Sequence, residues 1–133
     1  MKRRQRGGKY NRQRGQDLVE YALVLPIVLL ILMSILDLGR VVYVYSSLHN
    51  SVREGARYGI IYPTDAAGIE AIVRTKAVGL DPVDLTVVVV QPDLQTVRVR
   101  ATYQFAVVSP IVSVLVGGSP WPLGSQTTMR VEG

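Results

Sequence analysis

The chain has 133 residues, enough for one small domain with an appendage, and its lack of cysteine excludes disulfides and thiolate metal sites. The net charge of +5 is misleading, because seven of the 15 basic residues lie before residue 16 with no acid among them. The other 8 basic residues face 10 acidic ones. A nucleic-acid-binding protein would spread its positive charge over a folded face, so we expect no nucleic-acid partner.

A membrane-length segment follows the basic cluster. Leu18 to Leu36 reads LVEYALVLPIVLLILMSIL, which is apolar apart from one carboxylate. As a helix it would span about 28 Å, close to the thickness of a bilayer's hydrocarbon core. The positive charge lies almost entirely before it, which predicts a cytoplasmic N-terminus and an exported C-terminal part. No small-residue cleavage site follows the segment, so hydropathy alone favours an uncleaved anchor carrying an extracytoplasmic binding domain.

The carboxylate of Glu20 argues against a simple anchor. A charge within a spanning segment is costly, and such residues are candidates for function with a partner to be named. Cleavage between Gly15 and Gln16 would remove the seven basic residues and create an α-amine four residues from Glu20. That amine could be neutralised by the Glu20 of a neighbouring chain, since two opposite charges lose water at lower cost together than alone.

These residues resemble the class III signal of type IV pilins, in which a basic leader ends in glycine and glutamate is the fifth residue after it. Glu20-Tyr21 matches the pair found in the Flp branch. The stretch GQDLVEYALVLPIVLLILMSILDLGR and the later REGARYG, Arg53 to Gly59, resemble the TadE-like family of the Tad (tight adherence) pilus systems. The resemblance covers about residues 14–60, and Arg130-Val131-Glu132 also fits the way such proteins end. Gln16 departs from the Phe or Met that opens other mature pilins.

The resemblance implies a structural pilin or pseudopilin and not an enzyme. A prepilin peptidase would remove residues 1–15, and the mature chain would pass from the inner membrane, through an inner-membrane assembly platform, into an extracellular filament or a pilus base. Before assembly the lipid bilayer would surround the helix. In the assembly, its partners would be like subunits or other pilins. The residues expected to pack against lipid or neighbouring helices are Leu18, Tyr21, Leu23, Leu25, Pro26, Val28, Leu29 and Leu32. The size of the remaining chain, larger than a typical Flp pilin, favours a minor subunit over the main filament subunit.

The helix should continue beyond the membrane segment, over residues 16–61. An amphipathic stripe of Val41, Tyr45, Leu48, Val52 and Ala56 supports this continuation. Pro26 should loosen one turn, and Pro63 should end the helix. Gly55 and Gly59 would permit close packing of another helix, or else they mark fraying near the helix end. Arg53, Glu54 and Arg57 fit a solvated helix face with local ion pairs better than a catalytic site.

Residues 62–133 should form a small extracytoplasmic α+β head. A second helix is expected from a Thr64 cap to about Val78, and a strand over Leu85–Val90 that is apolar on both faces. Pro92-Asp93 predicts a turn, and the alternation of residues 96–106 predicts a strand with Arg98 and Arg100 facing outward. A short helix would start at Ser109-Pro110 with serine as its cap, residues 119–124 would form a loop around Trp121, and residues 127–132 a closing strand. The predicted fold is a long helix packed against an antiparallel sheet of about three strands.

No cluster of residues supports catalysis, a metal or a cofactor. His49 is the only histidine and has no acidic partner at ligand spacing. Gly117-Gly118 is not followed by the lysine of a phosphate-binding loop, and no nucleophile is paired with a base. We therefore expect neither catalytic nor metal-ligating residues and no cofactor.

Overall fold

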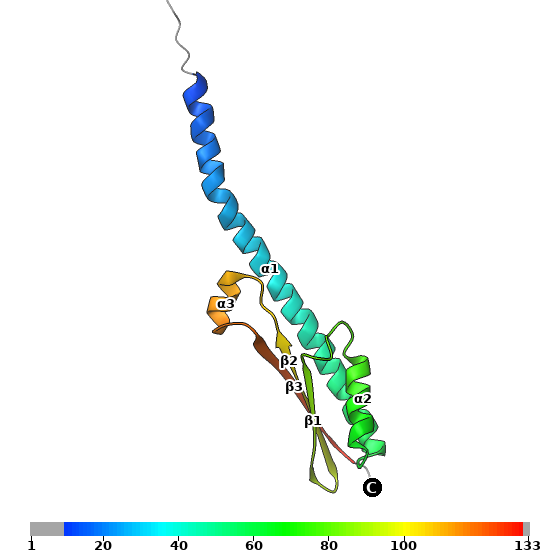
Figure 1. The fold of residues 1–133 in the computed structure, drawn as a ribbon. Coiled ribbons are helices and arrows are strands. Elements are labelled where there is room, and N and C mark those ends of the chain that lie inside the picture. Colours follow the sequence, from blue (N-terminus) through cyan, green and yellow to red (C-terminus); the bar gives the residue numbers. More distant parts are fainter. Residues whose placement is uncertain (1–9, 132–133) are drawn as a thin grey trace, which may run out of the picture.

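The computed structural model describes residues 10–131, with side chains described from Gly15 onward. Its α+β fold confirms the predicted architecture of one long helix and a small head (Figure 1). The elements in chain order are α1 (Tyr10–Ile61), α2 (Ala66–Lys76), β1 (Leu85–Asp93), β2 (Thr96–Phe105), α3 (Pro110–Val116) and β3 (Trp121–Arg130). The first nine residues of the predicted leader lie outside the described residues, as do Glu132 and Gly133.

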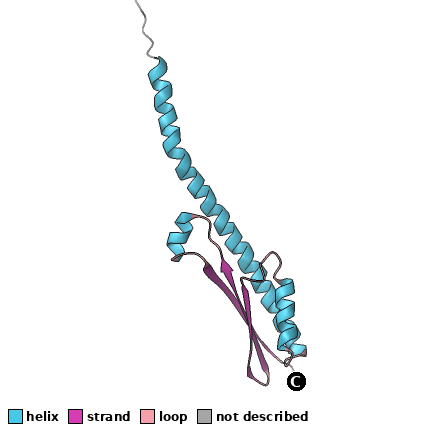
Figure 2. Ribbon diagram, viewed as in Figure 1, coloured by secondary structure: helices cyan, strands magenta, loops and turns pink. Residues whose placement is uncertain are grey.

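The long helix is confirmed, although it begins at Tyr10 and not at Gln16. It runs without interruption through Pro26, whose ring nitrogen cannot donate a hydrogen bond to the carbonyl of Ala22. The N-terminal half of α1 extends alone from the molecule, and the C-terminal half lies along the head (Figure 2). One helix therefore passes through two different surroundings without a break in its backbone.

The C-terminal half of α1 supplies much of the core. Leu48, Val52 and Ala56 are fully buried, as the predicted stripe requires. The stripe was wrong at Tyr45, whose side chain is 52% exposed, because the neighbouring Val44 points into the core instead. Tyr45 stacks on His49 at the edge of the interface, with ring centroids 6.3 Å apart, which leaves the phenol hydroxyl near solvent.

Glycines allow α2 to approach α1 closely, as predicted. A Cβ atom on Gly55 would collide with the side chain of Val73 on α2. A Cβ atom on Gly59 would lie 2.9 Å from Val97 Cγ1 and 3.0 Å from Ile69 Cδ1. The absence of a side chain at these two positions is thus what permits Ile69 and Val73 to reach zero exposure.

The start of α2 corrects one prediction, because Asp65 and not Thr64 is its N-cap. One carboxylate oxygen of Asp65 accepts the Gly68 N–H at 2.9 Å, and the other accepts the Tyr58 hydroxyl at 2.9 Å. A carboxylate satisfies the free N–H groups of a first turn and also meets the positive end of the helix dipole. Asp65 thereby joins the end of α1 to the start of α2.

The three strands form one antiparallel sheet in the order β1-β2-β3. β1 and β2 form a hairpin whose turn is at Leu94 and Gln95, so Pro92, predicted in the turn, lies within β1 instead. Pro92 is tolerated there because β1 is an edge strand and an edge has no second partner to bond. The predicted alternation of β2 is confirmed, with Val97 and Val99 buried against the helices.

The other strands differ from the prediction in two respects. In β1, Val88 and Val90 are exposed on the outer face, so that strand has one buried face and not two. β3 begins at Trp121, where a loop was predicted, and its first pair is Trp121 with Phe105 of β2. Pairing along the full length of β2 overrides the local preference of Pro120, Pro122 and Gly124 for irregular structure.

We expect Gly55→Ala to destabilise the head relative to Gly39→Ala. Both substitutions add the same methyl group to α1, but the space around Gly39 is open whereas Val73 occupies the space beside Gly55. Helix propensity favours both variants equally, so overpacking leaves Gly55→Ala less stable than Gly39→Ala by about 1–3 kcal/mol. Denaturant unfolding of the full chain in detergent, followed by the fluorescence of the single tryptophan, measures the difference. Equal stabilities would contradict the close approach of α2.

Candidate functional site

The N-terminal half of α1, which extends alone from the molecule, is the most distinctive surface of the described chain. It is called the free half, and the half that lies along the head is called the packed half. α1 is long and apolar enough to cross a membrane, and it is the only helix among the described residues with these properties. An apolar helix surface of this length is unfavourable in water, because each exposed apolar side chain costs free energy that burial would recover. The surface therefore requires lipid or the helices of other chains around it.

The residues predicted to pack in a membrane or filament all lie on this free half and are exposed. Apart from Pro26, their exposed fractions range from 43% at Val28 to 75% at Tyr21. Because successive residues turn by about 100°, most of them share one face of α1, whereas Leu23 lies on the other side. The residues that share the face are Leu18, Tyr21, Leu25, Val28, Leu29 and Leu32.

The predicted cleavage site lies within α1, because the helix starts before Gly15. Gly15 is exposed and a Cβ atom on it would meet nothing within 4 Å, so the glycine is not needed for packing within the chain. Gln16 and Glu20 are one helical turn apart, with a rise of about 6 Å between them. Asp17, Glu20, Tyr21 and Val24 line one shallow groove along α1, and the two carboxylates are both exposed there.

At the end of the apolar run, the carboxylate of Asp37 fastens the head to α1. Asp37 is 2% exposed, and its Oδ2 atom accepts the backbone N–H groups of Val108 at 2.9 Å and Ser109 at 2.5 Å. Its Oδ1 atom accepts a hydrogen bond from the Arg40 guanidinium at 3.2 Å. Charge-assisted bonds of this kind offset the cost of burying a carboxylate. Sequence reasoning assigned Asp37 only to the end of the apolar run.

Two further contacts complete this junction. The hydroxyl groups of Ser34 and Ser109 lie 2.8 Å apart, and Ser34 also donates to the carbonyl of Leu30. Ser109 precedes α3, as predicted, but its hydroxyl turns to Ser34 and makes no capping bond. The Arg40 guanidinium lies 4.9 Å from the ring centroid of Phe105, a cation–π distance. The junction thus joins α1 to α3 and to the end of β2.

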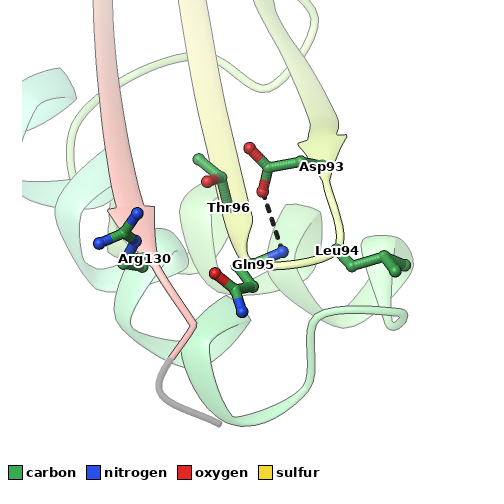
Figure 3. A pocket seen from close by; sticks show the side chains of 5 residues that line it. All are labelled: Asp93, Leu94, Gln95, Thr96 and Arg130. Carbon is green, nitrogen blue, oxygen red and sulfur yellow. Dashed lines mark hydrogen bonds between the residues drawn. The ribbon is translucent and has the colours of Figure 1, made fainter.

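A second hollow lies at the opposite end of the head, beside the β1–β2 turn (Figure 3). Asp93 accepts the Gln95 N–H at 2.9 Å, which is a turn-forming bond, and Leu94 points away into solvent. Hydrogen bonds from Thr96 and then from Gln95, together with the charge of Arg130, lower the pKa of Asp93. These contacts are those of a well-formed hairpin turn.

Other polar groups of the head are structural. The Tyr58 hydroxyl donates to Asp65, and because ionisation would remove that bond, the pKa of Tyr58 is raised. His49 lies 3.3 Å from the hydroxyl of Ser125 on β3. Arg57 and Glu54 form an exposed ion pair at 3.4 Å, which confirms the predicted solvated face. Within the described part of the chain, no three His, Asp or Glu residues gather as a metal site would require.

Comparison with known proteins supports the resemblance drawn from the sequence. Residues 15–57 match the family model described as TadE-like protein. The match starts at Gly15 and covers the free half of α1, the junction at Asp37 and most of the packed half. The match leaves α2, the sheet and α3 outside the matched region. No curated protein and no solved structure matches the chain.

We expect Asp37→Ala to destabilise the head, whereas Glu54→Ala should change its stability very little. Both substitutions remove the acid of an i,i+3 pair with arginine on α1, but Asp37 is buried and Glu54 is exposed. Asp37→Ala also removes the acceptor of the part-buried Val108 N–H and of the buried Ser109 N–H, at a cost of about 2 kcal/mol. Loss of an exposed pair costs less than about 0.5 kcal/mol.

Tryptophan fluorescence reports this difference directly, because Trp121 pairs with Phe105 next to the junction. Denaturant midpoints are measured for the full chain in detergent with both variants. If the two variants unfolded at the same denaturant concentration, the junction would contribute no more than a surface ion pair.

Proposed function

We propose that the chain is a structural, pilin-like subunit of a Tad pilus, held in the cytoplasmic membrane by α1 and assembled through the same helix after its leader is removed. The observation that carries the proposal is the match to TadE-like proteins over a helix whose apolar half has no cover within the chain. Its proposed partners are like subunits or other pilins, and a prepilin peptidase acts on it after Gly15. A minor, pilus-supporting role fits the size of the head.

The position of Gly15 suits a peptidase that must reach the peptide bond. The Gly15–Gln16 bond lies inside α1, so the helix must open locally before the bond can enter an active site. Glycine lowers the cost of opening, because it destabilises a helix by about 1 kcal/mol relative to alanine. Its missing side chain also lets the backbone approach the enzyme closely, at no cost to packing within this chain.

Removal of the leader would create a positive charge with which Glu20 can pair. Cleavage leaves a positive α-amine on Gln16 beside the carboxylates of Asp17 and Glu20, at the positive end of a shortened helix. In an apolar bundle, a buried charge without an opposite partner is costly. We propose that Glu20 of one subunit meets the Gln16 amine of the next, which selects a fixed stagger between neighbouring helices.

Intact mass of the membrane-extracted protein tests the cleavage. In cells with an active prepilin peptidase, we expect the wild-type chain to lack residues 1–15 and Gly15→Ala to retain them. Gly39→Ala places the same methyl group further along α1, where the surroundings are equally open, and should be processed normally. A wild-type chain that kept Met1 to Gly15 would instead indicate an uncleaved anchor with an extracytoplasmic binding domain.

Glu20→Ala should be cleaved normally but should enter filaments poorly. Burying the new amine without its partner carries a cost, and each ~1.4 kcal/mol of that cost lowers incorporation about tenfold. Asp17→Ala is the matched control, because it removes the other exposed carboxylate of the same turn. Incorporation is measured as the ratio of this chain in sheared filaments to that in membranes. Equal incorporation of the two variants would refute the pairing role of Glu20 while leaving the family match intact.

A further inference from the structure

The short helix α3 presents an apolar face that nothing in the described chain covers. Val112 points inward and is 5% exposed, whereas Val114 and Leu115 are 81% and 79% exposed. Ile111 and, just before the helix, Val108 extend the same surface. The spacing of these residues places them on the outer side of α3, because positions three and four apart share a helix face.

This surface lies at the end of the head nearest the free half of α1, and the β1–β2 turn lies at the opposite end (Figure 1). Ser109, at the start of α3, contacts Ser34, which is inside the apolar run that ends at Leu36. Asp37, the first residue after that run, holds the backbone just before α3. The depth of α3 is therefore fixed at the outer edge of the membrane-length segment.

Neither α3 nor its flanking loops carry a charged residue. No Asp, Glu, Lys, Arg or His occurs between Arg100 and Arg130, a stretch that includes α3 and its flanking loops. A segment that contacts water along its whole length would normally carry charged residues. The combination of an apolar outer face, a lack of charge and a fixed depth matches a helix that lies in the membrane interface.

We propose that α3 is a second membrane contact, which inserts Ile111, Val114 and Leu115 into the outer leaflet beside α1. The occupant of this face is lipid, because Ser109 at the start of α3 contacts Ser34 in the apolar run of α1, so the face begins at the depth where that run ends. The proposal rests on α1 spanning a bilayer and does not require removal of the leader or assembly into a filament.

Site-directed spin labelling tests this placement, and the native chain has no cysteine to remove. Three full-length variants are labelled: Leu115→Cys on α3, Val28→Cys in the free half of α1, and Leu94→Cys at the hairpin turn. Leu115 and Leu94 are a matched pair, since both are strongly exposed leucines at opposite ends of the head. Each variant is reconstituted at low density in phosphatidylethanolamine and phosphatidylglycerol vesicles, so that subunits do not cover one another.

Collisions of the label with oxygen and with a water-soluble nickel chelate report lipid and water, respectively. We expect labels at Leu115 and Val28 to collide with oxygen and to lose contact with the chelate, and the label at Leu94 to show the reverse. If Leu115 resembled Leu94 while Val28 stayed in lipid, the α3 proposal would be overturned and the spanning helix would stand. If Val28 also resembled Leu94, the membrane placement of α1 would fail, and the α3 proposal with it.

Discussion

The structure depends on a single continuous helix that must satisfy two different surroundings. Apart from the one bond that Pro26 cannot donate, backbone hydrogen bonds run along α1 from Tyr10 to Ile61, so a change in the direction of one half is transmitted to the other. The free half exposes apolar side chains in every direction, as a lipid-facing or bundle-facing helix does. The packed half exposes polar residues on one side and buries a stripe under the head. A head on a flexible linker would have no fixed position relative to the membrane, whereas a head packed along α1 does.

The Asp37 junction is where these two halves meet, and its chemistry explains why a carboxylate is buried there. The chain before α3 approaches α1 with the N–H groups of Val108 and Ser109 directed at Asp37, and the Ser109 bond is fully buried. An apolar residue at position 37 would leave both donors unpaired. A carboxylate accepts both bonds and receives a third from Arg40. The head is consequently held to the helix at the point where the apolar run ends.

The parts of the fold that were predictable from the sequence are those where one periodicity dominates. In the long helix and in β2, many residues follow the same periodicity, so tertiary contacts did not alter the predicted element. The stripe on α1 was displaced at Tyr45 because steps of three and four are both compatible with a helix face, and only packing against the sheet selects Val44. Trp121 was assigned to a loop because prolines and glycine surround it, yet pairing with β2 determines its strand.

The residues of the candidate site also differ in how far the sequence predicts their roles. Gly15 and Glu20 were singled out as candidates because their proposed roles depend on spacing along the chain. The role of Asp37 could not be predicted, since the two N–H groups that it holds are more than 70 residues away in sequence. They are backbone groups, which any residue except proline supplies. A charged residue directly after a membrane-length run was the available signal, but such residues usually face water. Only the path of the chain before α3 shows that this one does not.

A second membrane contact at α3 would limit motions that a single spanning helix leaves free. One helix fixes the depth of a protein but allows it to rotate about its own axis and to tilt. α3 lies to one side of α1, so burying its outer face in lipid favours a single rotation of α1 relative to the membrane plane. Each buried Val or Leu side chain contributes about 1.5–3 kcal/mol toward that preferred rotation. The Glu20 end of the helix would then face a preferred direction before a neighbouring subunit binds. Two subunits would therefore sample fewer relative orientations before they assemble. The same contact opposes extraction, so a subunit that leaves the bilayer must have this face of α3 covered by another chain or exposed to water.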